Sequence, residues 1–177
     1  DPSNNHLDIL HKIKKIKLNA DLKIITPLSY GNKKYANKVE EEFIRYFGDS
    51  YISLRQFMSL EDYYKILCKA NTCIMAHTRQ QAMGNIIMML RMGYRIFMNK
   101  ESPAYRFLKD NKIEVYPLEM IDEMAELITT PLDRIHQINN EKVIKELFSA
   151  KKNREQTKIM IDLMLNFQKN KKKCITY

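Results

Sequence analysis

Apolar residues in the first two thirds of the chain fall into two alternating patterns. Short apolar runs are typical of buried strands, and apolar residues that recur every three or four positions are typical of helices. The strands predicted in this way cover 22–27, 51–54, 72–76, 94–98 and 115–116. The helices predicted between them cover 6–17, 33–47, 60–70, 85–92 and 103–110.

The alternation of strands and helices predicts the fold class. Such spacing is typical of parallel βαβ units, so we expect an α/β protein with a Rossmann-like parallel sheet and helices on both faces. This domain would cover residues 1–118. Residues 119–177 are predicted to be helices that pack on it and end in a basic tail, with breaks near Thr130-Pro131 and Asn139-Asn140.

In parallel sheets of this kind, ligands bind beyond the carboxyl ends of the strands. The loops that follow the predicted strands should therefore converge at one edge of the sheet. They are 29–32, 54–58, 77–84 and 99–102.

The loop at 77–84 carries the strongest indication of function. It leads from a buried strand onto an apolar helix, whose first N–H groups and dipole favour an anion. Arg79 would add positive charge, Gln80, Gln81 and Asn85 would add amides, and Gly84 would allow close approach of the backbone. We therefore predict a phosphorylated ligand. A polar loop that only caps a buried helix would have the same composition.

Three other segments stand at predicted junctions between a loop and a helix. Ser3, Asn4 and Asn5 would offer polar groups to an anion, or would only cap the helix that follows. Glu101 would accept hydrogen bonds from sugar hydroxyls, or would only favour the helix dipole. Phe57 would flank a nucleobase, or would act as a hydrophobic staple on the next helix.

Charge is unevenly distributed along the chain. The net charge is +9, and residues 145–177 hold nine Lys and Arg against three Asp and Glu. This tail is either a solvated helix face or a surface attracted to anionic lipid and phosphorylated substrates. Aromatic residues do not interleave with the basic ones, so nucleic acid is not an expected partner.

The order of these segments resembles the donor-binding, C-terminal domain of GT-B glycosyltransferases. More closely, DPSNNH at the start, RQQAMG in the loop and NKESP after the next strand resemble glycosyltransferase family 56. This family contains the 4-alpha-L-fucosyltransferase-like enzymes of enterobacterial common antigen synthesis. The resemblance covers about residues 1–118, and the basic tail only loosely.

The resemblance implies an activity and a location. The family transfers an acetamido-deoxyhexose of the Fuc4NAc type from a dTDP-sugar to a saccharide on a polyprenyl diphosphate. It works at the cytoplasmic face of the inner membrane, so a peripheral membrane contact is expected.

The resemblance also implies roles for the residues singled out above. Arg79, Gln80, Gln81, Gly84 and Asn85 would hold the diphosphate, and Ser3, Asn4 and Asn5 would face its distal phosphate or the sugar. Phe57, His77, Glu101 and Ser102 would contact the base or the sugar. No metal is required where Arg79 and the helix dipole neutralise the leaving diphosphate.

In the family, the first motif follows a strand and a Gly-Asn-Ser turn, and the sequence starts after both. We therefore expect a longer enzyme whose general base lies in an N-terminal domain, so that the catalytic residues stay unassigned. The chain alone is expected to bind donor weakly without turnover.

Two other functions stay open at this level. A non-catalytic flavodoxin-like or receiver-like module would have the same fold. A receiver domain requires acidic residues at the strand ends, where this chain has Pro27, Arg55, His77 and Asn99. The second is a basic adaptor that docks on anionic membrane or RNA through 151–173.

Overall fold

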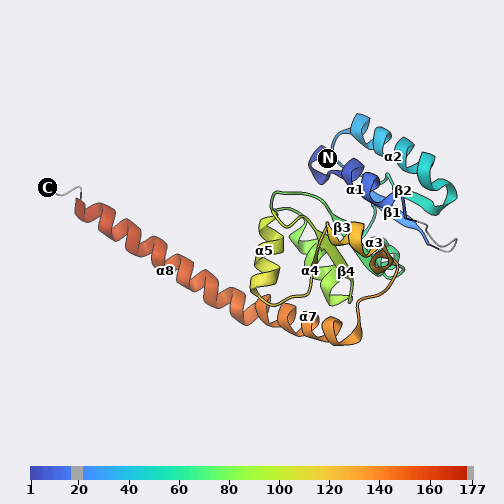
Figure 1. Cartoon of the computed structure of the whole chain (residues 1–177). Coiled ribbons are helices and arrows are strands. Elements are labelled where there is room, and N and C mark those ends of the chain that lie inside the picture. The colour runs from blue at the N-terminus through green and yellow to red at the C-terminus, as the bar shows by residue number, and fades with distance from the viewer. Residues whose placement is uncertain (17–21, 175–177) are drawn as a thin grey trace.

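Short parallel strands and the helices around them form the body of the protein, from which one long helix extends (Figure 1). The computed structural model describes residues 1–16 and 22–174, with side chains described as far as residue 164. The strands are β1 (Ile24–Pro27), β2 (Tyr51–Leu54), β3 (Thr72–Met75), β4 (Arg95–Met98) and β5 (Tyr116–Pro117).

All the paired strands are parallel, as the sequence predicts. β1 pairs with β2, and β4 pairs with β3 on one side and β5 on the other, so that hydrogen bonding divides the strands into a pair and a triplet. Side chains join the two groups, because Leu28 and Tyr51 share one apolar cluster with Ala76 and Phe97. The predicted α/β class with an open parallel sheet is confirmed.

Strand β4 shows that helices cover both faces of the sheet. All four of its residues are buried, and successive side chains point to opposite faces. Ile96 and Met98 belong to the apolar cluster formed with α4, α5 and α7, whereas Phe97 belongs to the cluster formed with α1 and α2. Burial on both sides explains why the three residues after Arg95 are all apolar.

Each predicted helix of the body is present. They are α1 (His6–Ile13), α2 (Lys33–Phe47), α3 (Leu60–Leu67), α4 (Met83–Arg91) and α5 (Pro103–Asp110). However, α1 ends at Ile13, four residues before its predicted end at residue 17, which lies outside the described residues. Asn32 and Ser59 cap α2 and α3 through side-chain oxygens that accept backbone hydrogen bonds. Ser102 stands at the N-cap of α5, but its hydroxyl makes no capping bond.

The tail differs from the prediction at Asn139-Asn140. α7 (Arg134–Leu147) runs through both residues without a break, after the short helices α6 (Met120–Glu123) and η3 (Ala125–Ile128). Asn140 is fully buried, where its side chain accepts a hydrogen bond from the backbone N–H of Glu114 and donates one to the same residue's carbonyl. Asparagine is tolerated inside this helix because it binds the backbone of another segment.

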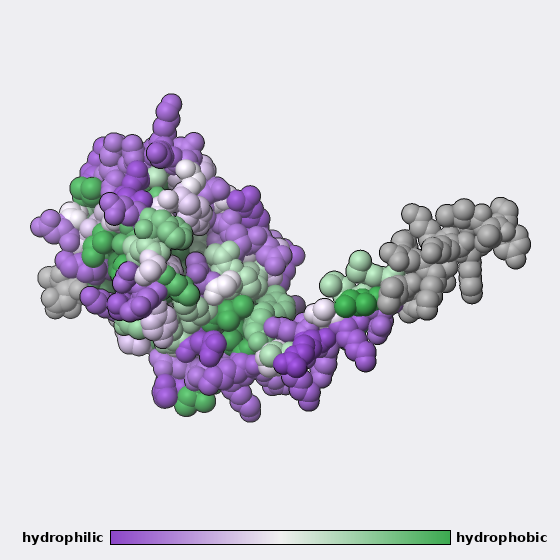
Figure 2. Space-filling model, turned by 180° about the vertical axis from the view of Figure 1, so that it is seen from behind, coloured by the Kyte–Doolittle hydropathy of each residue, from purple (hydrophilic) through white to green (hydrophobic). Residues whose placement is uncertain are grey.

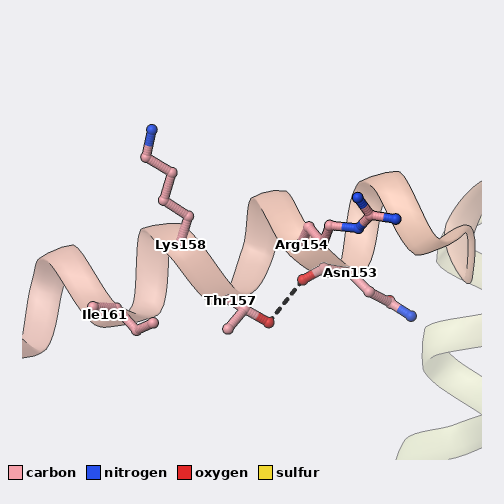
Figure 3. Close-up of a pocket in the computed structure, with 5 residues that line it drawn as sticks. All are labelled: Asn153, Arg154, Thr157, Lys158 and Ile161. Atoms are coloured by element: carbon pink, nitrogen blue, oxygen red, sulfur yellow. Dashed lines mark hydrogen bonds between the residues drawn. The ribbon is translucent and has the colours of Figure 1, made fainter.

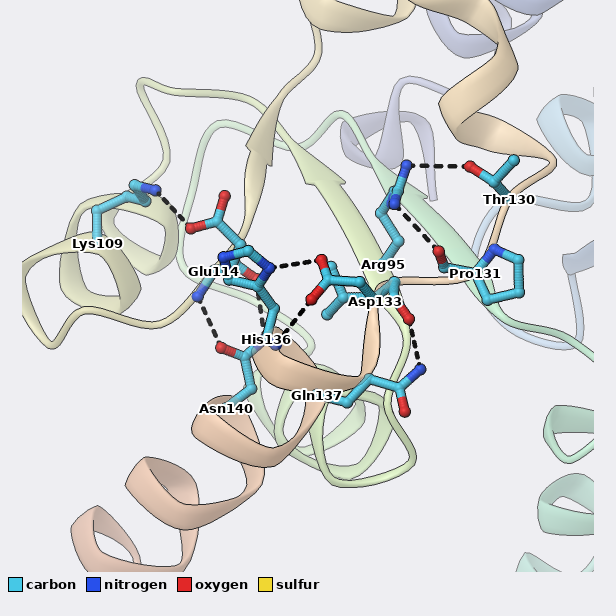
Figure 4. Close-up of polar contacts among 10 residues, drawn as sticks. Arg95, Lys109, Glu114, Thr130, Pro131, Asp133, His136, Gln137 and Asn140 are labelled. Carbon is cyan, nitrogen blue, oxygen red and sulfur yellow. Dashed lines mark hydrogen bonds and ion pairs between the residues drawn. The ribbon is translucent and has the colours of Figure 1, made fainter.

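Arg95 ties the tail to the start of β4 (Figure 4). Its guanidinium is buried and donates hydrogen bonds to the carbonyl oxygens of Leu127 and Pro131 and to the hydroxyl of Thr130. It also lies 5.2 Å from the centre of the Tyr116 ring. The predicted break near Thr130-Pro131 is confirmed, and it is the segment that this arginine holds.

The last helix, α8 (Ala150–Cys174), does not pack on the body over its described length. α7 contacts α4, but α8 leaves the body at the end of α7 and points away from it (Figure 1). The prediction that all tail helices pack on the sheet domain is therefore wrong for α8. Within the described residues, no helix has the length and apolar character needed to cross a bilayer.

Candidate functional site

The loop that follows β3 makes direct contact with the first residues of the chain. Arg79 Nε donates a 2.9 Å hydrogen bond to Gln81 Oε1, and Arg79 Nη2 donates a 2.8 Å bond to Ser3 Oγ. The carboxylate of Asp1 lies 3.5 Å from the same nitrogen, and Gln81 Nε2 donates to Asn4 Oδ1 at 2.5 Å. We call these five residues the loop cluster.

The loop cluster brings together two motifs that are more than 70 residues apart in the sequence. Asn5 positions the first of them: it adopts the left-handed conformation (φ 53°), and its side-chain amide donates to the carbonyl oxygen of Ala76 at the end of β3. Ser3 and Asn4 therefore contact the loop directly, through Arg79 and Gln81.

A third segment reaches the loop cluster at Gly31. This residue has a φ of +92°, which favours glycine, and a Cβ atom added there would lie 2.8 Å from the backbone nitrogen of Asp1. The turn after β1 thus approaches the opening segment closely. Two of the loops predicted to converge, 29–32 and 77–84, do so through Asp1.

Beside the loop cluster, the N-terminus of α4 is open. The helix begins at Met83, two residues earlier than predicted, after Ala82 in the left-handed conformation without a side-chain cap. No described residue accepts a hydrogen bond from the backbone N–H of Met83, Gly84 or Asn85. A Cβ atom added to Gly84 would have no neighbour within 4 Å. The positive end of this helix thus faces unfilled space.

Several of the predicted phosphate ligands keep free polar groups. Gln80 and Asn85 are exposed, and their amides make no hydrogen bond to described residues. Arg79 is 63% exposed, and its Nη1 also has no described partner. An anion placed here would meet amides, a guanidinium edge and backbone N–H groups.

The residues predicted to contact base and sugar are in different surroundings. Phe57 is 90% exposed, so the interpretation of this residue as a packed staple is wrong. Glu101 is exposed and pairs with Arg106 at 3.1 Å. Ser102 is fully buried, and its hydroxyl has no hydrogen-bond partner among the described residues.

Two buried histidines lie next to the loop cluster in sequence. Burial lowers the pKa of His77, and the nearby charge of Arg79 lowers it further. Burial also lowers the pKa of His6 to about 4, with a smaller contribution from the amino group of Asp1. His77 Nε2 and His6 Nδ1 are buried and have no partner among the described residues. Both rings are therefore neutral near pH 7.

Two hollows in the described surface lie away from the loop cluster. One has a volume of about 570 Å³ between α1 and the α6–η3 segment and is lined by Lys12, Lys15, Asp122 and Glu126 among others. The other, of about 350 Å³, runs along α8 between Asn153 and Ile161 and is bounded by that helix alone (Figure 3). Within residues 1–16 and 22–174, no cluster of three His, Cys, Asp or Glu side chains could hold a metal.

Sequence reasoning missed several residues that build this site. Asp1 was part of the opening motif, but its pairing with Arg79 depends on contact across the fold. Nothing in the sequence indicates that Gly31 contacts Asp1. Nor does it indicate that the hydroxyl of Tyr35, a residue of the α2 pattern, accepts a hydrogen bond from the backbone N–H of His6. The one sequence signal for these contacts is Gly31 itself, because a glycine in the loop after a strand permits a turn with positive φ.

These features define the class of the protein. An open parallel sheet with a polar loop and a free helix N-terminus beyond its carboxyl edge is the usual place for a phosphorylated ligand in α/β proteins. The family described as 4-alpha-L-fucosyltransferase, glycosyl transferase group 56, matches the chain over residues 1–160. The chain therefore belongs to this family of glycosyltransferases. No solved structure matches it.

Proposed function

We propose that residues 1–118 bind the nucleotide-diphosphate sugar of a glycosyltransferase of this family. The observation that supports this most is the open N-terminus of α4 beside the loop cluster, where N–H groups of Met83, Gly84 and Asn85 have no described partner. A diphosphate would replace the water on these groups and would accept from Arg79 as well. The donor would be a dTDP-linked acetamido-deoxyhexose, as the family resemblance suggests.

The same groups would assist the reaction. Sugar transfer breaks the bond between the anomeric carbon and the diphosphate, so negative charge grows on the leaving oxygen. Fixed N–H dipoles and a guanidinium stabilise that charge without having to reorganise. Arg79 would do this best if the diphosphate displaced the Asp1 carboxylate, which lies 3.5 Å away. Phe57, which is largely exposed, would be free to cover the thymine.

The acceptor in this proposal is a saccharide on a polyprenyl diphosphate, and the protein works on the cytoplasmic face of the membrane that holds it. The positive charge of the protein supports this part of the proposal, because both the acceptor and the membrane surface are anionic.

A thermal-shift assay tests the donor site. We expect dTDP to raise the Tm, since a ligand that binds only the folded state stabilises it. Arg79→Ala should remove most of this shift. Arg45→Ala is the matched control, because Arg45 is similarly exposed (68%) and, among the described residues, pairs with Glu42 of the same helix α2. The proposal fails if millimolar dTDP gives no shift, or if both variants respond like the original chain.

A further inference from the structure

Helix α8 presents apolar side chains that nothing in the described structure covers. The five large ones are between 49% and 65% exposed. They are Ile159, Met160, Ile161, Leu163 and Met164. Figure 2 shows them as a hydrophobic band on the projecting helix, next to a hydrophilic stretch closer to the body. A contiguous exposed apolar surface of this kind marks a binding surface.

The band has a defined orientation around the helix. Successive residues are rotated by about 100°, so the five positions cover about 200° of the circumference. Lys158 and Asp162 lie on the remaining side. α8 is thus amphipathic along this stretch, with an apolar side wider than its polar side.

Charge indicates what covers the band. α8 carries eight Lys and Arg against two Asp and Glu, a surplus of six positive charges. Lys151, Lys152, Arg154 and Lys158 precede the apolar residues, and Lys169 with 171–173 follows them in the sequence. Two copies of such a helix would repel each other at these basic ends, whereas an anionic surface would attract both ends.

We propose that α8 binds anionic lipid bilayers, lying in the interface with its apolar band among the acyl chains and its basic residues among the headgroups. An amphipathic helix with a basic polar side is built for this position. The inference extends the proposed function, since it explains how the donor site would reach a lipid-linked acceptor.

The position of α8 suits this role. The helix leaves the body at the end of α7, well apart from the chain's first residues and hence from the loop cluster (Figure 1). α8 would therefore bind the bilayer without covering the donor site.

Co-sedimentation with vesicles tests the inference on the full 177-residue chain. We expect binding to vesicles of phosphatidylcholine mixed with phosphatidylglycerol, weak binding to phosphatidylcholine alone, and loss of binding as salt rises from about 0.1 M to about 1 M. Ile159→Gln/Leu163→Gln should lower the partition coefficient at least roughly tenfold, because two inserted side chains lose their apolar contact. Lys151→Gln/Lys158→Gln should lower it by a similar factor and flatten the salt dependence.

A matched control distinguishes insertion of α8 into the bilayer from non-specific binding through any exposed apolar residue. Ile135→Gln/Ile138→Gln changes two exposed apolar residues of α7 (80% and 52% exposed) and should leave vesicle binding unchanged. The α8 variants should keep the Tm and the helical circular dichroism of the original chain, which shows that any loss of vesicle binding is not a loss of folding.

Three results would overturn the inference. The first is absence of binding to anionic vesicles, and the second is binding by Ile159→Gln/Leu163→Gln as strong as that of the original chain. The third is a chain that does not bind vesicles but forms a dimer in sedimentation equilibrium, which this variant abolishes. The last result would assign the band to a second copy. The dTDP shift of the Tm is measured on the same variants, so failure of lipid binding and failure of donor binding are read separately.

Discussion

Single residues decide whether the N-terminus of α4 can receive a ligand. Gly84 is the clearest example, since it stands in the first turn of the helix, where an added Cβ atom meets no protein atom. Its small size is therefore not needed for packing. Under the proposed function, the missing side chain lets the diphosphate approach the backbone at this position.

Gly84→Ala tests this explanation. Alanine favours helix over glycine by about 1 kcal/mol, so the Tm without ligand should stay unchanged or rise slightly. The new methyl group would occupy the approach to the backbone, so the dTDP-induced shift of the Tm should shrink. A variant that is more stable and responds fully to dTDP would show that the ligand does not approach Gly84.

His6 predicts a pH dependence of stability. Its pKa falls from 6.5 to about 4 on folding, so the unfolded chain binds the extra proton between these values. The contribution of His6 to the free energy of unfolding should be fully present above pH 6.5. It should be lost, by roughly 3 kcal/mol, as the pH falls to about 4. Urea unfolding at several pH values measures it.

The difference between His6→Gln and the original chain isolates this contribution, because the variant lacks the buried imidazole. His11→Gln, on an exposed position of α1, should keep the full dependence. If His6→Gln loses as much stability on acidification as the original chain, the burial of His6 is not what drives the change.

At the scale of elements, the sequence predicts what is local. The five strands and the helices between them follow from apolar spacing, Asn32 and Ser59 cap as their residue types suggest, and the loop after β3 is polar as its position requires. The break predicted at Asn139-Asn140 fails for a physical reason. Asparagine destabilises the interior of a helix unless its side-chain amide is hydrogen-bonded. Here the amide of Asn140 bonds to the backbone of Glu114, which is 26 residues away in the sequence.

Asn140→Ala should destabilise the protein by about 3 kcal/mol. The substitution removes two hydrogen bonds and leaves the buried N–H and carbonyl groups of Glu114 without a partner. Asn139→Ala is the neighbouring control, since this exposed side chain makes one 3.2 Å bond to Lys112, and it should cost less than about 1 kcal/mol. Urea unfolding of the two variants measures both changes in the free energy of unfolding. Equal changes would contradict the role given to Asn140.

At the scale of the whole molecule, the contacts that build the candidate site are those that sequence reasoning could not supply. The opening motif and the loop after β3 could each be recognised as polar and suited to an anion. That Arg79 pairs with Asp1 and Ser3, or that Gly31 presses against Asp1, depends on how distant segments fold together. The same holds for α8, whose helical pattern is plain but whose lack of contact with the body is not.

The central claim is that a nucleoside diphosphate binds at the N-terminus of α4. Nuclear magnetic resonance of ¹⁵N-labelled protein tests it most directly, because each backbone N–H reports its own surroundings. On addition of dTDP, the amide signals of Met83, Gly84 and Asn85 should shift furthest, while thymidine, which lacks the diphosphate, should leave them nearly unmoved. If dTDP binds and these three signals stay in place, the diphosphate lies elsewhere and the account is wrong.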